Sequence, residues 1–255
     1  MARLGTTTAL LPPEGTPAAP ELLVPGSSWR LEASLDLFSR PVGLGLTTQA
    51  SAGRWLRILE RASSGSRVRV RLAEDGYPGW LEPAHLLGRA RVSCSPPRPR
   101  LNRAAIAARL EQVLAFALAA MEVPNTYLWG GTVGPNYDCS GLVQTAFASA
   151  GIWLPRDAYL QERFCRPVAV QPGVTHLLEP GDLIFFGTAR RCTHVGLHLG
   201  GGRYLHSSGR EHGRNGLGID NLNPRNSDSV ARHYRAELRG AGRVMHSHDG
   251  SPLPT

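Results

Sequence analysis

The stretch Tyr127-Leu128-Trp129-Gly130-Gly131, followed by Asp138-Cys139-Ser140-Gly141-Leu142-Val143, decides the fold of this 255-residue chain. Glycines and a proline between the two segments indicate a loop, and the apolar residues after it recur at helical spacing until Gly151. Cys139 is therefore expected at or near a helix N-terminus, where free amide groups and the helix dipole stabilise a thiolate. The alternative is a small buried thiol, because free cysteine is commonly buried.

Possible partners for this thiol lie downstream, in three apolar runs at residues 181–186, 193–199 and 204–206 that we expect to be consecutive strands. Three glycines, residues 200–202, give a tight connection between the last two runs, so His194 and His206 are expected on neighbouring strands. A thiol that attacks an amide needs an imidazole within hydrogen-bond reach, and that imidazole needs a second polar group to fix its tautomer. His194 and His206 suit these two roles.

With these residues in place, residues 104–243 resemble the NlpC-type cell-wall peptidases, a family of papain-like cysteine peptidases. The resemblance rests on YLWGG, DCSGLV, GIWLPRDAYLQ, LEPGDLIFF and THVGLHLGGGRYLH, in the order and spacing of the family. It implies Cys139 as nucleophile, His194 as general base and acid, and His206 as the residue that orients His194. It also implies that Tyr127 helps to bind the oxyanion, where one donor commonly contributes about 10²- to 10³-fold in rate. Such a mechanism needs no metal or organic cofactor.

A zinc site built from Cys192, His194 and His198 is a competing interpretation, because the two histidines would share one face of a strand. Structural zinc usually takes four ligands with paired spacing, and no fourth ligand is obvious here. We therefore expect His198 to be packed or hydrogen-bonded. Cys94, Cys165 and Cys192 lack DCSG-like surroundings and are expected to be ordinary thiols.

Residues 27–95 have the pattern of a small β-barrel, with short alternating runs separated by Gly, Ser and Pro clusters. Within them, LAEDGYPGWL at residues 72–81 resembles the closing part of a bacterial SH3-like domain. The overall expectation is an α+β chain in which this barrel precedes the papain-like domain. Residues 1–26 are expected to be irregular, residues 96–103 a linker and residues 244–255 a disordered tail. Asn102 is expected to cap a helix. The apolar face of that helix would comprise Ile106, Leu110, Val113, Ala117 and Met121.

This domain arrangement resembles the γ-D-glutamyl-L-diamino acid endopeptidases, which cut peptidoglycan stem peptides between D-Glu and the diamino acid. In those enzymes the aspartate of an LPRDS-like motif and a tyrosine of the SH3-like domain bind the free amine of an N-terminal L-Ala. Asp157 in LPRDA and Tyr77 in DGYPGW match. A carboxylate in a closed pocket favours an ammonium group and leaves an acylated nitrogen poorly satisfied. Ala158 departs from the serine of the motif, which removes one expected substrate hydrogen bond.

Other roles remain open for these residues. Asp157 could instead cap a helix or pair with a neighbouring arginine, and Tyr77 could pack beside Trp80. Asp138 and Ser140 flank the nucleophile and are further candidate substrate contacts. Because stem peptides carry carboxylates, a basic site would attract them, and Arg156 is the nearest candidate in sequence.

The net charge is +8, and all 28 basic residues are arginine. The alternation of Arg and Val at residues 67–71 is typical of a half-exposed strand, and no nucleic-acid motif is present. Prolines interrupt the N-terminal apolar residues, and we expect neither a signal peptide nor a membrane span. Four unpatterned cysteines fit a reducing compartment.

Together these features predict a cytoplasmic cysteine peptidase that recycles wall peptides with a free N-terminal L-Ala. Two alternatives stay open. One is an exported hydrolase that acts on the intact wall, with its barrel bound to the polymer, and the other is a catalytically idle module that binds wall peptides. The sequence does not predict the oligomeric state or which diamino acid is accepted.

Overall fold

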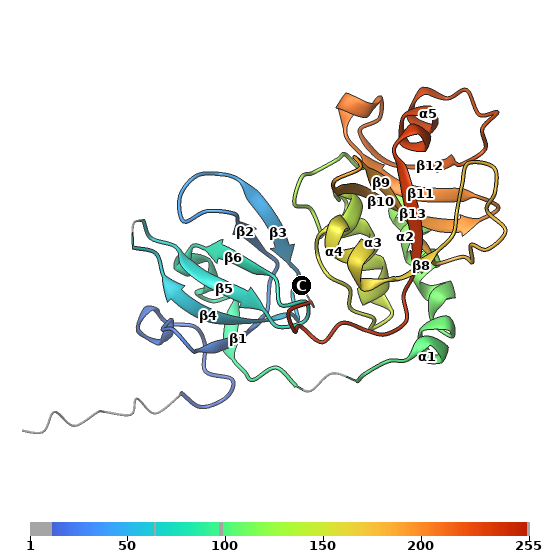
Figure 1. Ribbon diagram of the computed structural model, residues 1–255. Helices are drawn as coiled ribbons and strands as arrows, with labels where there is room; N and C mark the ends of the chain where they lie inside the picture. The colour runs from blue at the N-terminus through green and yellow to red at the C-terminus, as the bar shows by residue number, and fades with distance from the viewer. Residues whose placement is uncertain (1–11, 64, 97–98, 254–255) are drawn as a thin grey trace, which may run out of the picture.

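The N-terminal domain consists of short strands whose alternate side chains are buried. The computed structural model describes residues 12–63, 65–96 and 99–253, and Figure 1 shows this domain beside a larger one. Its seven strands form one antiparallel sheet in the order β3-β2-β6-β5-β4-β1-β7. They are β1 (Ser28–Leu31), β2 (Leu35–Phe38), β3 (Leu46–Ala50), β4 (Trp55–Arg61), β5 (Val68–Leu72), β6 (Pro78–Leu81) and β7 (Ala90–Val92). In β5 the apolar residues are buried and Arg69 and Arg71 are exposed, as the alternation predicted.

Three strands, β2, β3 and β7, lie wholly or largely outside the alternating runs expected at residues 29–35, 55–59, 68–72 and 79–81. The sequence of β3 is Leu-Thr-Thr-Gln-Ala, which is too polar to show an apolar alternation. It forms one edge of the sheet and faces the second domain. There the Oε1 of Gln49 accepts hydrogen bonds from the backbone amides of Thr132 (3.2 Å) and Val133 (3.1 Å). Gln49 of β3 thus hydrogen-bonds across the domain boundary, which accounts for a polar residue in this strand.

The segment before the barrel is largely irregular, as predicted, but it is attached to the barrel. A 3-10 helix spans Pro20–Leu22, and the backbone amides of Gly15 and Ala18 donate to carbonyls of β7 at 2.8 and 2.9 Å. Leu23 is fully buried in the barrel core. Residues 12–26 therefore pack as part of the first domain, while residues 1–11 of the predicted segment lie outside the described residues.

The second domain is a six-stranded antiparallel sheet with helices on both faces (Figure 1). The strand order is β12-β11-β10-β9-β13-β8. The strands are β8 (Arg166–Val168), β9 (Leu183–Gly187), β10 (Cys192–Gly200), β11 (Arg203–Ser208), β12 (Gly216–Asn221) and β13 (Leu238–Arg243). The helices are α1 (Arg103–Ala107), α2 (Leu110–Met121), α3 (Cys139–Ser149), α4 (Ala158–Phe164) and α5 (Ser229–Ala236). The predicted strands β9, β10 and β11 are confirmed as neighbours.

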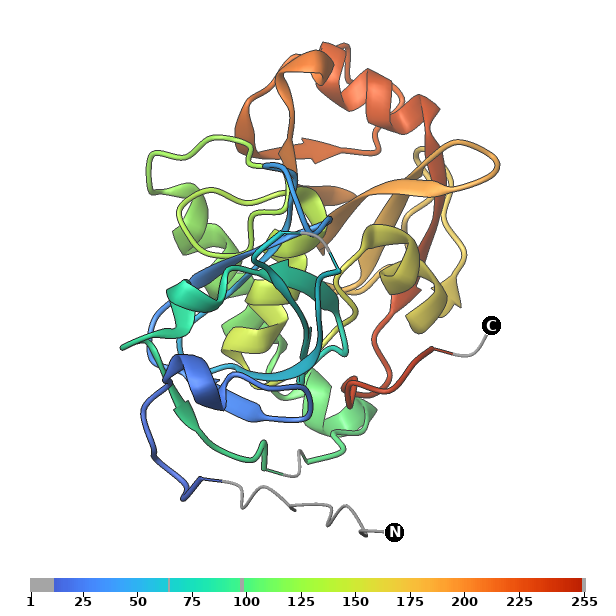
Figure 2. The same cartoon turned by 90° about the vertical axis from the view of Figure 1, so that its left-hand side faces the viewer.

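Strand β9 is apolar at successive positions because both faces of the sheet are covered. Leu183 and Phe185 belong to the core shared with α2, α3 and α4, whereas Ile184 and Phe186 belong to the core shared with α5. A strand buried on both sides has no polar alternation, which is why this run is continuous in the sequence. Figures 1 and 2 both place α5 on the far side of this domain from the barrel.

The helix predicted after Asn102 is present in two pieces. Asn102 caps α1 through its Oδ1, which accepts from the amide of Ala105 at 3.0 Å, and a break near Arg109 separates α1 from α2. Ile106, Val113 and Ala117 are buried, as predicted. We expected no membrane span from the sequence, but Arg103–Met121 has the length and hydropathy of one. This is weak evidence for a membrane span, because the core helix of a protein passes the same test.

The prediction of a disordered tail is wrong for residues 244–253. Val244, Ser247 and His248 are buried, and the rings of His246 and His248 contact that of Phe164 at 4.5 and 5.4 Å. The polar composition suggested a solvated tail, but these side chains find partners on both domains. Figure 1 shows this red segment running from the second domain back to the barrel.

Candidate active site

Asp138 shapes the turn that presents Cys139 at the start of α3. Its Oδ1 accepts from the amide of Gly141 at 2.6 Å as the helix cap, and its Oδ2 accepts from the amide of Gly130 at 2.9 Å. A Cβ at Gly141 would lie 2.0 Å from the carbonyl oxygen of Gly131, so glycine is required at position 141 for this close approach. The two motifs are therefore joined at a single turn, and Cys139 is the first residue of the helix.

Arg156 supports the turn that presents Cys139, and its side chain is nearly fully buried. Its Nη2 donates to Asp138 Oδ2 at 2.6 Å, its Nη1 donates to Asp138 Oδ1 (3.1 Å) and Ser140 Oγ (2.9 Å), and its Nε donates to Thr48 Oγ1 of β3 (2.9 Å). All three nitrogens are engaged inside the protein. These three residues, Arg156, Asp138 and Ser140, thus satisfy one another and position the turn, while they also line the pocket in front of Cys139, and their contact with substrate stays a prediction.

The structure brings His194 and His206 together and adds a third residue, Asp220, that the sequence analysis missed. His194 Nε2 lies 2.7 Å from His206 Nδ1, and His206 Nε2 lies 2.7 Å from Asp220 Oδ2. The Nη2 of Arg214 donates to both oxygens of Asp220, at 3.0 and 2.9 Å. In the sequence Leu217 and Ile219 alternate with Gly218 and Asp220, so the pattern would place Asp220 on a solvated face, and only the structure shows that it is buried.

Asp220 determines which ring nitrogens of His206 and His194 carry a proton. Burial would raise the pKa of Asp220, but the hydrogen bond from His206 and the charge of Arg214 lower it overall. An ionised carboxylate only accepts, so His206 carries its proton on Nε2 and leaves Nδ1 free to accept. His194 must then donate from Nε2, which leaves its Nδ1 with a lone pair. His194 is therefore set in the tautomer of a base.

The resting thiol and imidazole are both neutral. Burial raises the pKa of Cys139 to about 12, with a further contribution from Asp138, although backbone hydrogen bonds from Val195 and Ser140 oppose the rise. Burial also lowers the pKa of His194 well below its ordinary value, and the neighbouring His206 adds to this effect. The raised pKa disfavours the thiolate expected at the helix N-terminus, because burial outweighs the backbone hydrogen bonds and the Arg156 charge that favour the anion.

Two tyrosines flank the pair. Tyr234 of α5 stacks on the ring of His194, with centroids 4.2 Å apart, and its hydroxyl shares a 2.7 Å hydrogen bond with Ser208 Oγ. Tyr127 lines the same pocket as Cys139. Burial and the nearby Cys139 raise the pKa of Tyr127, so its hydroxyl remains a donor at neutral pH. Tyr234 was not predicted, since α5 lies outside every quoted motif.

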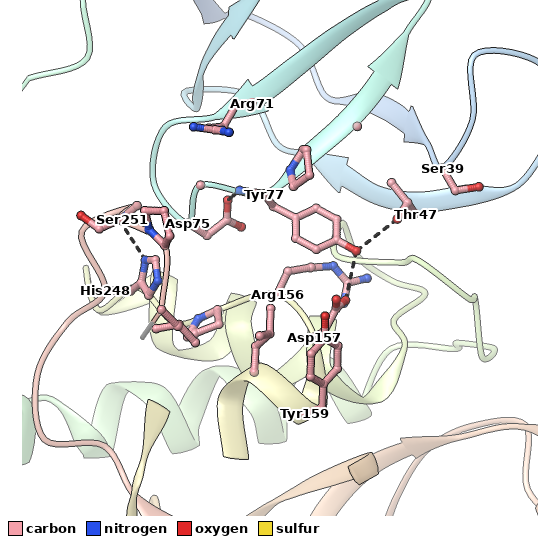
Figure 3. Close-up of a pocket in the computed structure, with 18 of the residues that line it drawn as sticks. Ser39, Thr47, Arg71, Asp75, Tyr77, Arg156, Asp157, Tyr159, His248 and Ser251 are labelled. Carbon is pink, nitrogen blue, oxygen red and sulfur yellow. Dashed lines mark hydrogen bonds between the residues drawn. The ribbon is translucent and has the colours of Figure 1, made fainter. Parts of the chain in front are cut away.

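The pocket in front of Cys139 has a volume of about 540 Å³ and is lined by both domains. The hydroxyl of Tyr77 donates to Asp157 Oδ1 at 3.1 Å and lies 3.1 Å from Thr47 Oγ1 of β3 (Figure 3). Asp157 occupies the cap position of α4 but makes no capping hydrogen bond with its side chain. Its carboxylate instead faces the pocket. The two residues predicted to bind an amine are thus brought together across the domain boundary.

Arg191 is the arginine that lines this pocket from an exposed position. Its guanidinium lies 4.4 Å from the ring centroid of Tyr159. Burial raises the pKa of Asp157, and the charge of Arg191 is among those that oppose this rise. Sequence patterns alone do not favour Arg191 over Arg156, because the two are 35 positions apart and only the fold shows which one is exposed at the pocket.

The remaining histidine and cysteines occupy ordinary environments. His198 Nδ1 lies 2.9 Å from the carbonyl of Glu179, and its Nε2 accepts from the amide of Gly202 at 3.1 Å, so His198 is hydrogen-bonded as predicted. Among the described residues, no cluster of three or more His, Cys, Asp or Glu side chains could hold a metal ion. Cys94 is exposed, whereas Cys165 and Cys192 are buried and free.

Residues 124–236 match the model of the NlpC/P60 family, and residues 37–86 match that of the bacterial dipeptidyl-peptidase Sh3 domain. The chain carries an NlpC/P60 domain. The NlpC/P60 region contains Cys139, His194, His206 and Asp220, whereas Tyr77 comes from the SH3-like domain. Both predicted modules are confirmed, in the predicted order.

Two curated relatives come from Bacillus subtilis strain 168. The bifunctional muramidase/DL-endopeptidase CwlT is 36% identical over 122 residues, which cover 46% of this chain and 32% of that protein. The γ-D-glutamyl-L-lysine dipeptidyl-peptidase is 33% identical over 132 residues, which cover 51% of this chain and 41% of that protein. The chain thus covers less than half of the length of each of these relatives.

A solved NlpC/P60 family protein from Bacillus cereus ATCC 10987 superposes with a TM-score of 0.64 and covers 86% of this chain and 100% of its own. At 20% identity this likeness shows that the fold is shared.

Proposed function

We propose that this protein is a cysteine endopeptidase that cleaves the γ-D-glutamyl–diamino acid bond of peptidoglycan stem peptides with a free N-terminal L-Ala. The observation that carries the proposal is the Tyr77–Asp157 hydrogen bond at 3.1 Å, which puts a carboxylate of the second domain and a barrel hydroxyl in the catalytic pocket. An ammonium group at that point gains a charge-assisted hydrogen bond. An N-acylated peptide would leave the carboxylate without this partner.

The catalytic steps follow from the arrangement of neutral groups. Cys139 transfers its proton to Nδ1 of His194 as its sulfur attacks the γ-carbonyl of D-Glu. Tyr127 and backbone amides donate to the developing oxyanion, which is where such donors have their largest effect. His194 then protonates the departing amine, and afterwards it activates the water that hydrolyses the thioester. The hydrogen bonds through His206 to Asp220 stabilise the imidazolium in both half-reactions.

Arg191 provides the positive charge that the substrate carboxylates require. Unlike Arg156, it is exposed at the pocket and keeps its guanidinium near the Asp157 end. A peptide bound with its amine at Asp157 would carry the α-carboxylate of D-Glu between that amine and the scissile bond. A cation beside this path favours such a ligand by charge.

Wall-peptide recycling is the cellular role that we infer from selection of a free amine, since intact wall carries an acylated L-Ala. A cytoplasmic location goes with this role. Both statements stay predictions. Several relatives are named as endopeptidases, which supports the coarser assignment.

The test uses the purified chain, a Cys139→Ala control, and two peptides followed by mass spectrometry: L-Ala-γ-D-Glu-meso-diaminopimelate and its N-acetylated form. Cleavage of the free-amine peptide alone, and only with Cys139 present, is the expected result. Equal cleavage of both peptides would keep the peptidase and refute amine selection, which favours a hydrolase of intact wall. Cleavage of neither would contradict the proposal and favour a binding module.

A further inference from the structure

The amine-binding pocket depends on a turn of the barrel that both domains contact. The residues between β5 and β6, with the sequence Ala73-Glu74-Asp75-Gly76-Tyr77, present Tyr77 to Asp157. Asp75 orders this turn internally, because its Oδ1 accepts from the amide of Tyr77 at 3.0 Å and pairs with Arg54 at 3.0 Å. Its Oδ2 accepts from Gln144 of α3 at 2.9 Å. The turn is thus tied to the helix that begins at Cys139.

The C-terminal strap, defined here as residues 247–251, holds the same turn from its other side. His248 is buried, and its Nδ1 accepts from the amide of Gly250 at 2.8 Å (Figure 3). The backbone of Glu74 is close enough to the imidazole to oppose the lowering of its pKa that burial causes. Because Nδ1 accepts, the proton of the neutral ring lies on Nε2. His248 thus lies beside the barrel turn and lines the same cavity as Asp75 and Tyr77.

The strap and the turn also meet backbone to backbone. A Cβ added at Gly76 would lie 2.3 Å from the carbonyl oxygen of Gly250, and a Cβ added at Gly250 would lie 2.3 Å from that of Ala73. Both glycines have positive φ angles, +69° and +86°. A side chain at either position would clash and would also be strained, so this contact needs glycine on both segments.

The strap is anchored independently on the peptidase domain. Ser247 Oγ accepts from the amide of Trp153 at 2.9 Å, and the amide of His248 donates to the Trp153 carbonyl at 2.8 Å. Trp153 precedes Asp157 by four residues on the same loop. The His248 ring also contacts that of Phe164, at the end of the helix that Asp157 begins. One short segment thus touches the supports of both Tyr77 and Asp157.

We propose that the C-terminal strap is a positioning element for substrate selection, in which His248 holds the Tyr77 turn against the Asp157 loop so that the two side chains form one amine-binding site. This inference deepens the proposed function and rests on it. His248 acts through Tyr77 and does not contact the reacting atoms. The strap also lines a second cavity of about 700 Å³ that includes Tyr77 and Asp157, so it borders the amine site directly.

The first experiment compares His248→Ala and His248→Gln with a matched control, His246→Ala, which removes a neighbouring histidine that contacts Phe164 from outside the strap. For the free-amine peptide we expect His248→Ala to raise KM about tenfold with kcat within about twofold, because an interaction made equally in ground and transition states is lost. Gln can accept and donate at similar positions and should recover most of the affinity. His246→Ala should resemble the wild type.

A KM unchanged by His248→Ala, or an equal change in His246→Ala, would overturn the inference. So would a fall in kcat with KM unchanged.

A second experiment does not depend on activity. Deuterium exchange of the amides at residues 73–77 should be faster in His248→Ala than in His246→Ala, since the strap no longer holds the turn. Equal exchange rates in the two variants would refute the positioning role of the strap, even if the enzyme selects peptides with a free amine. Faster exchange in an enzyme that cleaves both peptides equally would support the strap and refute amine selection, so the two failures are distinguishable.

Discussion

The catalytic residues and the amine-binding residues are held in different ways. His194, His206 and Asp220 lie on the adjacent strands β10, β11 and β12, and their hydrogen bonds run across one sheet. Tyr77 and Asp157 are 80 positions apart and lie on different domains, joined by a single 3.1 Å hydrogen bond. Strand pairing therefore fixes the chemistry, whereas domain docking fixes the selectivity. Damage to one should leave the other largely intact.

The largest effect is expected from Asp220→Asn. An amide can donate to His206 Nε2, which would move the His206 proton to Nδ1 and force His194 into the tautomer that cannot accept from Cys139. We expect kcat to fall by about 10²- to 10⁴-fold, by the same logic as loss of the triad aspartate in serine proteases, with KM changed less than about threefold. Steady-state kinetics on the free-amine peptide measure this. A loss below about tenfold would show that His206 keeps its tautomer without Asp220.

Asp157→Asn should break selectivity while leaving the chemistry intact. Removing the charged partner of the ammonium group costs about 1.5–3 kcal/mol, so kcat/KM for the free-amine peptide should fall about 10- to 100-fold, chiefly through KM. The internal control is kcat at saturating free-amine peptide, which should stay within about twofold. A fall in kcat with KM unchanged would mean that Asp157 supports the catalytic turn instead.

Arg191→Gln should have a smaller effect, because an exposed ion pair contributes about 0–1 kcal/mol. We expect KM for the free-amine peptide to rise up to about fivefold, with kcat unchanged. Arg190→Gln is the matched control, since the neighbouring arginine is exposed and does not line the pocket. A peptide in which the α-carboxylate of D-Glu is amidated should bind the wild type and Arg191→Gln with the same affinity. If Arg191→Gln still weakens binding of that peptide, Arg191 contacts another part of the substrate.

The pH dependence of stability should reflect the buried histidines of the catalytic sheet. The pKa values of His194 and His206 are lowered by burial, so below about pH 6.5 the unfolded chain binds protons that the folded chain does not. The free energy of unfolding should therefore decrease as pH falls from 7.5 to 5.5, by about 1 kcal/mol per histidine. Urea unfolding at both pH values measures the difference. His194→Ala should reduce it, and an unreduced difference would assign it to other groups.

The sequence predicted the residues closest to the proposed nucleophile, but fewer of the residues that support them. Cys139, His194 and His206 lie in dense motifs whose spacing is preserved by local structure: a capped helix and a glycine hairpin. Asp220 and Tyr234 were missed because neither lies within a motif and each reaches His194 or His206 only through strand pairing or α5 packing. The positioning role of Arg156 was missed because sequence shows charge but not burial. The tail was predicted to be disordered because its composition is polar, although His248 lies beside the barrel turn.

The sequence by itself determined the elements: two modules, a helix that starts at Cys139, and strands that carry His194 and His206, since periodicity, caps and glycine turns act over a few residues. Only the tertiary structure decided which polar groups satisfy one another. Burial made the Cys139 thiol and the His194 imidazole neutral, and it committed Arg156 to Asp138. Docking of β3 and the strap brought Tyr77 to Asp157. These outcomes depend on desolvation and on contacts between distant segments, which local sequence patterns do not encode.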